Sequence, residues 1–485
     1  MPHSPPAAGA VIRGGVLRVG GFAVSALLGA LSAALLFRDL GVVDTARYMS
    51  IVSLVAIVAG VSDLGITQLG VRLLSIAAPS QRGSLSRELL GVRILVTLAG
   101  LVLILAFAAV AYPSVVVAGV AIAGVGLLLQ VTQDNYAVML QVELRFGWVA
   151  VLDVLRQAAI AGLIALFVLL GARLVVFSSA PVWAGIVVLV PAGLLIRGRR
   201  SLRPSFEPAR ARQLLRMVLP YSAAIMASTL YPREAIVLLH LIGGDRQLGI
   251  YSAAFRVVQG MSAVPALLIG TALPVLARSA VEDRARFDRV VGRVFAASVV
   301  AGGGLAVALG VGAPEAISLI GGRAFRAADS VLTIQSIALG ASFIASLWGN
   351  VLLSQRRYRA LVALNASAAV LLAALLGILV PADGARGAAT ATALAELVVA
   401  TAGGLLVCRG GRVRRPDLGV LGKVAVAVAA GVGPAVAIGA PVIVRALLAS
   451  ALYAAVVLLT RALPPEVVAV LRSWLRRRSR SGAPE

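Results

Sequence analysis

A series of long apolar segments, separated by short polar stretches, runs through nearly the whole chain. An α-helix needs about 20 apolar residues to cross the hydrocarbon core of a bilayer, and only helices or closed barrels satisfy their backbone there. The sequence therefore predicts an all-α polytopic membrane protein with about fourteen transmembrane helices. Twelve is the alternative, because Gly433, Pro434 and Pro441 interrupt the last pair. The predicted spans are Val16–Phe37, Met49–Leu73, Leu89–Tyr112, Val115–Gln141, Trp148–Gly171, Leu174–Ile196, Leu214–Leu241, Ile250–Leu276, Val290–Val311, Val331–Leu353, Leu361–Val380, Ala388–Cys408, Val420–Ile438 and Val442–Leu459.

The basic residues gather in alternate loops. The longest basic loop is RGRRSLRPSFEPARARQ, residues 197–213, whereas the intervening loops hold few arginines, among them Arg47, partly offset by Asp44 and Asp245. Cytoplasmic loops collect Lys and Arg, so this asymmetry predicts a cytoplasmic membrane protein with both termini in the cytoplasm. Topology accounts in this way for the net charge of +24, and no nucleic acid is expected as a partner.

The loop at residues 197–213 follows the sixth predicted span and divides the chain into two similar blocks. We predict an N-terminal six-helix bundle (residues 1–200), a second six-helix bundle (201–410), an additional helix pair (411–463) and a basic cytoplasmic tail (464–485). The second and eighth spans each begin with a tyrosine, Tyr48 and Tyr251, which faintly suggests a repeat. Two bundles related by a repeat are typical of transporters. The tail either lies on anionic membrane lipids or is only a solvated topology signal.

Charged residues at membrane depth are the candidate site residues, because they are costly there unless they face protein or water. In the first block these are Asp63, Asp134 and Arg156. We expect an ion pair between Asp134 and Arg156, which either holds the bundle together or lines a polar path. Arg18 and Arg93 lie near the predicted cytoplasmic ends of their spans and are expected to reach toward water. An inward-facing Arg18 would instead make the inner mouth basic.

The second block carries Arg233 and Glu234 in the seventh span, Arg256 in the eighth and Glu396 in the twelfth. Glu234 and Arg256 come out at similar depth in the outer half, so they can form an ion pair. The alternative is that Arg233 and Arg256 together receive an anionic group such as pyrophosphate. Glu396 is expected to be a lone carboxyl, either protonated or a coupling-ion site.

Absent features narrow the function further. The chain has one cysteine, Cys408, and two histidines, His3 and His240, so no disulfide, metal site or bound cofactor is expected. No phosphate-binding glycine motif of a nucleotide-hydrolysing enzyme occurs. The outer loops are short and poor in carboxylates, which disfavours a glycan polymerase or ligase. We therefore expect a protein that is not an enzyme.

Three stretches carry a resemblance to a known family: LGVVDTARYMSIVSLVAIVAGVSDLGITQLGVR (residues 40–72), YSAAFRVVQGMSAVPALLIGTALPVLA (251–277) and NVLLSQRRYRALVALN (350–365). They resemble the polysaccharide-export branch of the multidrug/oligosaccharidyl-lipid/polysaccharide (MOP) flippase superfamily, which contains the O-antigen and capsule repeat-unit flippases. The resemblance implies two bundles arranged as a V around a cationic central cavity that opens alternately to each side. It also implies that Arg256 matches an arginine thought to engage pyrophosphate in the lipid II flippase branch, and more weakly that Arg18 matches a first-helix arginine.

The resulting prediction is a flippase for a polyprenyl-pyrophosphate-linked oligosaccharide in cell-surface polysaccharide biosynthesis, with polymerases and glycosyltransferases as potential partners. An ion-coupled drug exporter of the same fold is the first alternative and would need carboxylates rather than arginines in its cavity. A membrane-embedded glycan polymerase or ligase, and a scaffold for cell-envelope enzymes, are alternatives from other classes.

Overall fold

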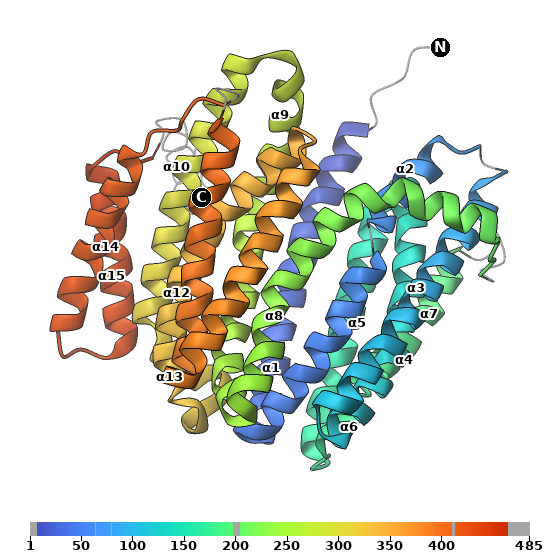
Figure 1. Cartoon of the computed structure of the whole chain (residues 1–485), viewed down its shortest axis with the longest axis horizontal. Helices are drawn as coiled ribbons and strands as arrows, with labels where there is room; N and C mark the ends of the chain where they lie inside the picture. Colours follow the sequence, from blue (N-terminus) through green and yellow to red (C-terminus); the bar gives the residue numbers. More distant parts are fainter. Residues whose placement is uncertain (1–6, 64, 79, 197–203, 410–412, 464–485) are drawn as a thin grey trace, which may run out of the picture. The chain divides into compact units, whose positions relative to one another are not determined.

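The computed structural model describes residues 7–63, 65–78, 80–196, 204–409 and 413–463, and within these ranges the chain forms helices and no strands (Figure 1). The first half contains α1 (Ala7–Asp63), α2 (Ile66–Ile76), α3 (Arg82–Ala111), α4 (Ser114–Val142), α5 (Phe146–Leu169), α6 (Leu174–Phe177), α7 (Ala180–Ile196) and α8 (Pro208–Met261). The second half contains α9 (Ala263–Glu282), α10 (Arg284–Val311), α11 (Ala313–Gly321), the 3-10 helix η1 (Gly322–Phe325), α12 (Ala328–Ser354), α13 (Tyr358–Cys408), α14 (Gly419–Ala437) and α15 (Val442–Leu459).

Among the described residues, eleven helices are long and apolar enough to cross a membrane. Three of them, α1, α8 and α13, are interrupted by non-helical backbone at Gly41, at Gly244 and at Asp383 with Gly384. An unbroken helix of the 51 residues of α13 would be about 76 Å long, more than twice the ~30 Å of a hydrocarbon core, so the interruption divides it. The all-α membrane fold is confirmed, while the count of fourteen crossings stays a prediction.

The interruptions in α1 and α8 are alike. Gly41 has φ 68° and ψ −172°, and Gly244 has φ 73° and ψ 178°, a backbone region that only glycine adopts readily. In both helices a tyrosine, Tyr48 or Tyr251, stands on the seventh residue after the glycine. The faint repeat in the sequence therefore corresponds to a repeated backbone feature.

The chain divides into two compact units. The first comprises residues 1–252 together with Ile320–Ala324, and the second comprises Ala253–Leu319 together with Phe325–Glu485. The passage from one to the other falls inside α8, between Ser252 and Ala253. The four-part division with boundaries at residues 200, 410 and 463 stays a prediction, and the tail from residue 464 lies outside the described residues.

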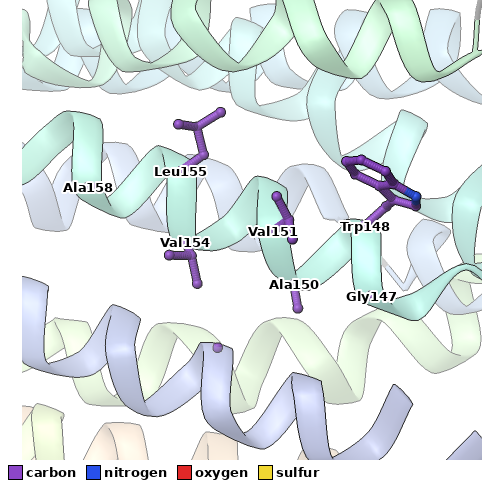
Figure 2. A pocket seen from close by; sticks show the side chains of 8 residues that line it. Gly147, Trp148, Ala150, Val151, Val154, Leu155 and Ala158 are labelled. Atoms are coloured by element: carbon purple, nitrogen blue, oxygen red, sulfur yellow. The ribbon is translucent and has the colours of Figure 1, made fainter. Parts of the chain in front are cut away.

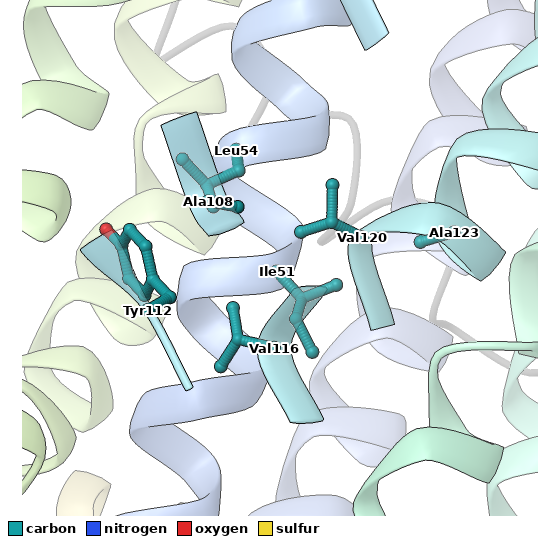
Figure 3. Packing of buried hydrophobic residues seen from close by; sticks show 7 residues of the cluster. All are labelled: Ile51, Leu54, Ala108, Tyr112, Val116, Val120 and Ala123. Carbon is teal, nitrogen blue, oxygen red and sulfur yellow. The ribbon is translucent and has the colours of Figure 1, made fainter. Parts of the chain in front are cut away.

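Within the first unit, α1 packs against α3, α4 and α5, and α7 packs against α4 and α5. One of its buried apolar clusters joins the second half of α1 to the end of α3 and the start of α4 (Figure 3). Its buried members are Ile51, Leu54, Ala108, Tyr112, Val116, Val120 and Ala123.

Within the second unit, α12 packs against α13 and α10, and α14 and α15 pack against each other and against α10. α10 and α12 approach closely at Gly302, where a Cβ would lie only 2.6 Å from the carbonyl oxygen of Gly340. Small residues at such crossings let membrane helices pack backbone to backbone. The Tyr453 hydroxyl in α15 donates a hydrogen bond of 2.6 Å to the Val300 carbonyl in α10, which fixes the terminal pair to this unit.

Candidate functional site

A buried arginine lies between two aspartates in the first unit. Arg93 of α3 is 6% exposed, and its Nη2 is 3.2 Å from Asp63 Oδ1 of α1 and 3.2 Å from Asp134 Oδ2 of α4. Its Nη1 donates to the Thr67 hydroxyl of α2 at 3.3 Å, and that hydroxyl donates in turn to Asp63 Oδ1. Four helices therefore contribute to one hydrogen-bonded ionic cluster, called the Arg93 cluster below.

The depth of Arg93 follows from where α3 begins. The helix starts at Arg82 rather than near Leu89, so Arg93 lies about 16 Å along it, farther from the helix end than its side chain can extend. The prediction that Arg93 extends toward the cytoplasm was wrong. The prediction began this helix at its first apolar residue. If it had begun the helix at Arg82, directly after the loop, Arg93 would have been recognised as a buried charge.

The predicted ion pair between Asp134 and Arg156 was also wrong, because Asp134 pairs with Arg93. Arg156 is a half-buried residue of α5 that acts on Asp134 only as a more distant charge, as does Asp153. The charges of α4 and α5 act on each other, but the closest contact of Asp134 is with the guanidinium of Arg93 on a third helix, α3.

In the Arg93 cluster, a guanidinium that belongs to the chain takes the place between two carboxylates that a soluble cation could otherwise occupy. Two carboxylates at membrane depth could hold a Na⁺ ion or a proton, but here a guanidinium lies within 3.2 Å of both. The guanidinium compensates the charge that would otherwise attract a soluble cation. Among the described residues, no three His, Cys, Asp or Glu side chains form a group that could hold a metal ion.

The other predicted site residues are placed as follows. Arg233 and Glu234 are half-buried in α8 and belong to the first unit, whereas Arg256, also half-buried in α8, belongs to the second. Arg256 Nη1 donates to Gln259 Oε1 at 3.0 Å. Contact between Arg256 and either Arg233 or Glu234 stays a prediction.

Two candidates remain. The side chain of Arg18 lies outside the described residues. Glu396 is half-buried in α13 and interacts with another residue, and its role as a coupling-ion site stays a prediction.

A second charged cluster lies where α1 and α8 are interrupted. Arg47 Nε donates to Asp245 Oδ2 at 2.9 Å and Arg47 Nη1 donates to Asp44 Oδ1 at 3.0 Å. The Nδ1 atom of His240 is 3.0 Å from the other oxygen of Asp245. The sequence placed Arg47 and Asp44 in one outer loop and Asp245 in another, and gave no sign that the two loops meet.

An apolar groove of about 660 Å³ runs between α1 and α5 (Figure 2). Gly21 of α1 faces the start of α5, where Trp148, Val151, Val154 and Leu155 contribute the larger side chains. None of the described side chains that line it is charged. The groove suits a hydrocarbon chain better than a sugar or a phosphate.

Comparisons with known proteins agree with this architecture. The family described as "Polysaccharide biosynthesis protein" matches residues 12–280. No match is found among proteins of curated function.

Three solved structures similar to this chain are a flippase and two transporters. A lipid II flippase MurJ in an inward closed conformation is 13% identical with a TM-score of 0.74, over 92% of this chain and 99% of that one. An inward-facing multidrug resistance MATE transporter of the MOP superfamily is 15% identical with a TM-score of 0.59, over 80% and 96%. A MOP superfamily transporter from Pyrococcus furiosus is 15% identical with a TM-score of 0.53, over 81% and 93%.

The family match covers more than half of the chain, and the fold extends the likeness to nearly all of it. The chain therefore belongs to the polysaccharide biosynthesis protein family and has the fold seen in the MurJ flippase and in the MATE transporters.

Proposed function

We propose that this protein moves a polyprenyl-pyrophosphate-linked oligosaccharide across the cytoplasmic membrane by alternating access. The observation that carries the proposal is the polysaccharide biosynthesis family match to residues 12–280. The fold likeness to a flippase whose own cargo is a lipid-linked precursor supports the same class of substrate.

The physical requirements of such a cargo match features of this chain. The polyprenyl tail can stay among apolar surfaces, and the groove between α1 and α5 offers one. The diphosphate needs cationic groups at membrane depth, and Arg233 and Arg256 are half-buried arginines of α8. In this proposal they contact the diphosphate, and Glu234 orients one of them.

The proposed orientation places both termini and the long basic loop in the cytoplasm, as the distribution of arginine favours. The interruptions at Gly41 and Gly244 then face the outside. Exchange of access consists of movement of one unit against the other. Polymerases and glycosyltransferases that make and consume the glycan are the proposed protein partners.

The fold likeness to multidrug resistance transporters supports a second candidate, an ion-coupled exporter. A cation-coupled mechanism through the first unit would use carboxylates such as Asp63 and Asp134. In this chain the guanidinium of Arg93 lies within 3.2 Å of both carboxylates, where a coupling cation would have to bind, which favours the glycan flippase.

The test uses the source cell with the chromosomal gene deleted and plasmid-borne variants restored. Loss of surface polysaccharide together with accumulation of lipid-linked oligosaccharide inside the cell is the expected effect of the deletion. Arg256→Ala should reproduce it at normal membrane abundance, and Arg256→Lys should restore part of the export. Arg278→Ala, which removes an exposed arginine of α9, is the matched control.

A wild-type amount of surface glycan in the deletion strain, together with raised drug susceptibility, would contradict the flippase function and support the exporter function. Full export by Arg256→Ala would remove Arg256 from the proposed diphosphate contact.

A further inference from the structure

His240 is a titratable side chain built into the point where α8 is interrupted. It lies near the end of the first part of α8, before Gly244, and its Nδ1 is 3.0 Å from Asp245 Oδ1. The second oxygen of the same carboxylate accepts a hydrogen bond from Arg47 of α1. The Asp245 carboxylate therefore joins the two sides of the interruption to each other and to α1.

The imidazole is held in place from its face as well. Its ring stacks on that of Tyr112 with centroids 4.2 Å apart and planes 11° apart. Tyr112 is itself anchored in the apolar cluster formed by α1, α3 and α4 (Figure 3). The ring also faces the backbone carbonyl of Ala111 at the end of α3. The position of the ring is thus fixed by Asp245 of its own helix and by Tyr112 and Ala111 at the end of α3.

Two acceptors face this ring, the Asp245 carboxylate and the Ala111 carbonyl. A neutral imidazole carries one N–H and can donate to only one of them, whereas an imidazolium carries two. The doubly protonated ring therefore satisfies the site more fully than the neutral ring.

The charge balance points in the same direction. In the described part of the chain, the charged and titratable groups around the ring are Asp245 from α8, Arg47 with its partner Asp44 from α1, and Tyr112 from the end of α3. With a neutral histidine, two carboxylates face one guanidinium. With a protonated histidine, the charges balance.

The location gives this protonation a mechanical consequence. The interruption at Gly244 precedes the passage of α8 from the first unit into the second, which falls between Ser252 and Ala253. Gly249 lies between them and packs so tightly on α1 that a Cβ would be 2.1 Å from the Val42 carbonyl oxygen. The segment from 240 to 252 is therefore held on α1 by the backbone packing at Gly249 and by the ion pair between Arg47 and Asp245.

We propose that His240 is a proton-binding site that locks the interrupted segment of α8 onto α1 and α3 when it is protonated and loosens it when it is neutral. Histidine is the side chain best suited to such a role, because its charge can change within the physiological pH range. The relevance to transport rests on the proposed function, in which this end of α8 faces the outside and senses the outer pH. The lock itself does not depend on the cargo.

The experiment is hydrogen exchange of the purified full-length protein in detergent at pH 5.5 and pH 7.5, with rates corrected for the intrinsic pH dependence of exchange. Amides of residues 240–252 should exchange roughly tenfold more slowly at the lower pH, as expected for a local opening that breaks a charge-assisted hydrogen bond. His240→Gln, which cannot be protonated, should remove this difference. His240→Arg, which is always charged, should give slow exchange at both pH values.

His3→Gln is the matched control, because His3 and His240 are the only histidines in the chain. It should keep the wild-type pH difference. Equal corrected rates at the two pH values in the wild type, or a difference that survives in His240→Gln, would overturn the proposal. Since no substrate is present, the result is independent of the glycan export assay: a failed lock leaves the flippase intact, and a failed export assay leaves the lock intact.

Discussion

Removing the guanidinium of Arg93 should destabilise the first unit strongly. In Arg93→Ala, Asp63 and Asp134 lose the cation that lies 3.2 Å from each, and the Thr67 hydroxyl loses a donor. Breaking a buried ion pair by deleting one partner costs about 3–5 kcal/mol. The side chains of Asp63 and Asp134 are 26% and 33% exposed, so water reduces the penalty. We expect a loss at the lower end, about 3 kcal/mol, or a Tm lower by roughly 6–12 °C.

The assay is the loss of monodisperse protein after heating, followed by size-exclusion chromatography of the detergent-solubilised variants. Arg145→Ala is the matched control, because Arg145 pairs with Glu143 at 3.5 Å but its side chain is 35% exposed. Surface pairs of this kind contribute about 1 kcal/mol or less. The Tm of the control should therefore stay close to that of the wild type.

The two aspartates provide a second check. Adding Asp63→Asn and Asp134→Asn to Arg93→Ala removes the uncompensated charges, so the triple variant should be more stable than Arg93→Ala alone. Equal melting of Arg93→Ala and Arg145→Ala would refute the reasoning. A triple variant no more stable than Arg93→Ala would show that charge compensation is not the cause.

Two further changes test the packing. Gly249→Ala should destabilise the protein by about 1–3 kcal/mol, because its Cβ would lie 2.1 Å from the Val42 carbonyl oxygen. Gly260→Ala, with nothing within 4 Å of the added Cβ, should be neutral or slightly stabilising. Thermal unfolding compares the two variants, and equal effects on stability would contradict the close approach of Gly249 to α1. Tyr453→Phe should lower the stability by about 1 kcal/mol, because it removes the hydrogen bond to the Val300 carbonyl. Tyr136→Phe, at a similarly buried tyrosine, should lower it less. Thermal unfolding compares the two variants, and equal losses of stability would show that this hydrogen bond does not hold α15 on α10.

The membrane fold could be predicted from sequence because the length and apolarity of a segment decide whether it crosses a bilayer. The interruptions at Gly41 and Gly244 could not be located in this way, since the chain contains 50 glycines and only backbone geometry distinguishes these two. Gly41 lies only four residues past the predicted end of the first span, and Gly244 lies between the seventh and eighth. The sequence therefore marked the gaps between these predicted spans but not the glycines that bend the chain within them.

The charged pairs were harder to predict than the spans. The sequence placed Asp134 at membrane depth in the fourth predicted span but could not show which neighbour its side chain faces. The partner proved to be Arg93, whose depth was misjudged because α3 continues through Arg87 and Glu88 to Arg82. The contact between Arg47 and Asp245 spans 198 residues, and sequence periodicity carries no signal at that separation.

The matching interruptions at Gly41 and Gly244 bear on the ancestry of the chain. A glycine in the same unusual conformation, followed at equal distance by tyrosine, is what a tandem gene duplication leaves behind when both copies keep one essential bend. Copies that preserve the same bend on the same side must have entered the membrane in the same direction, which requires an even number of crossings in each.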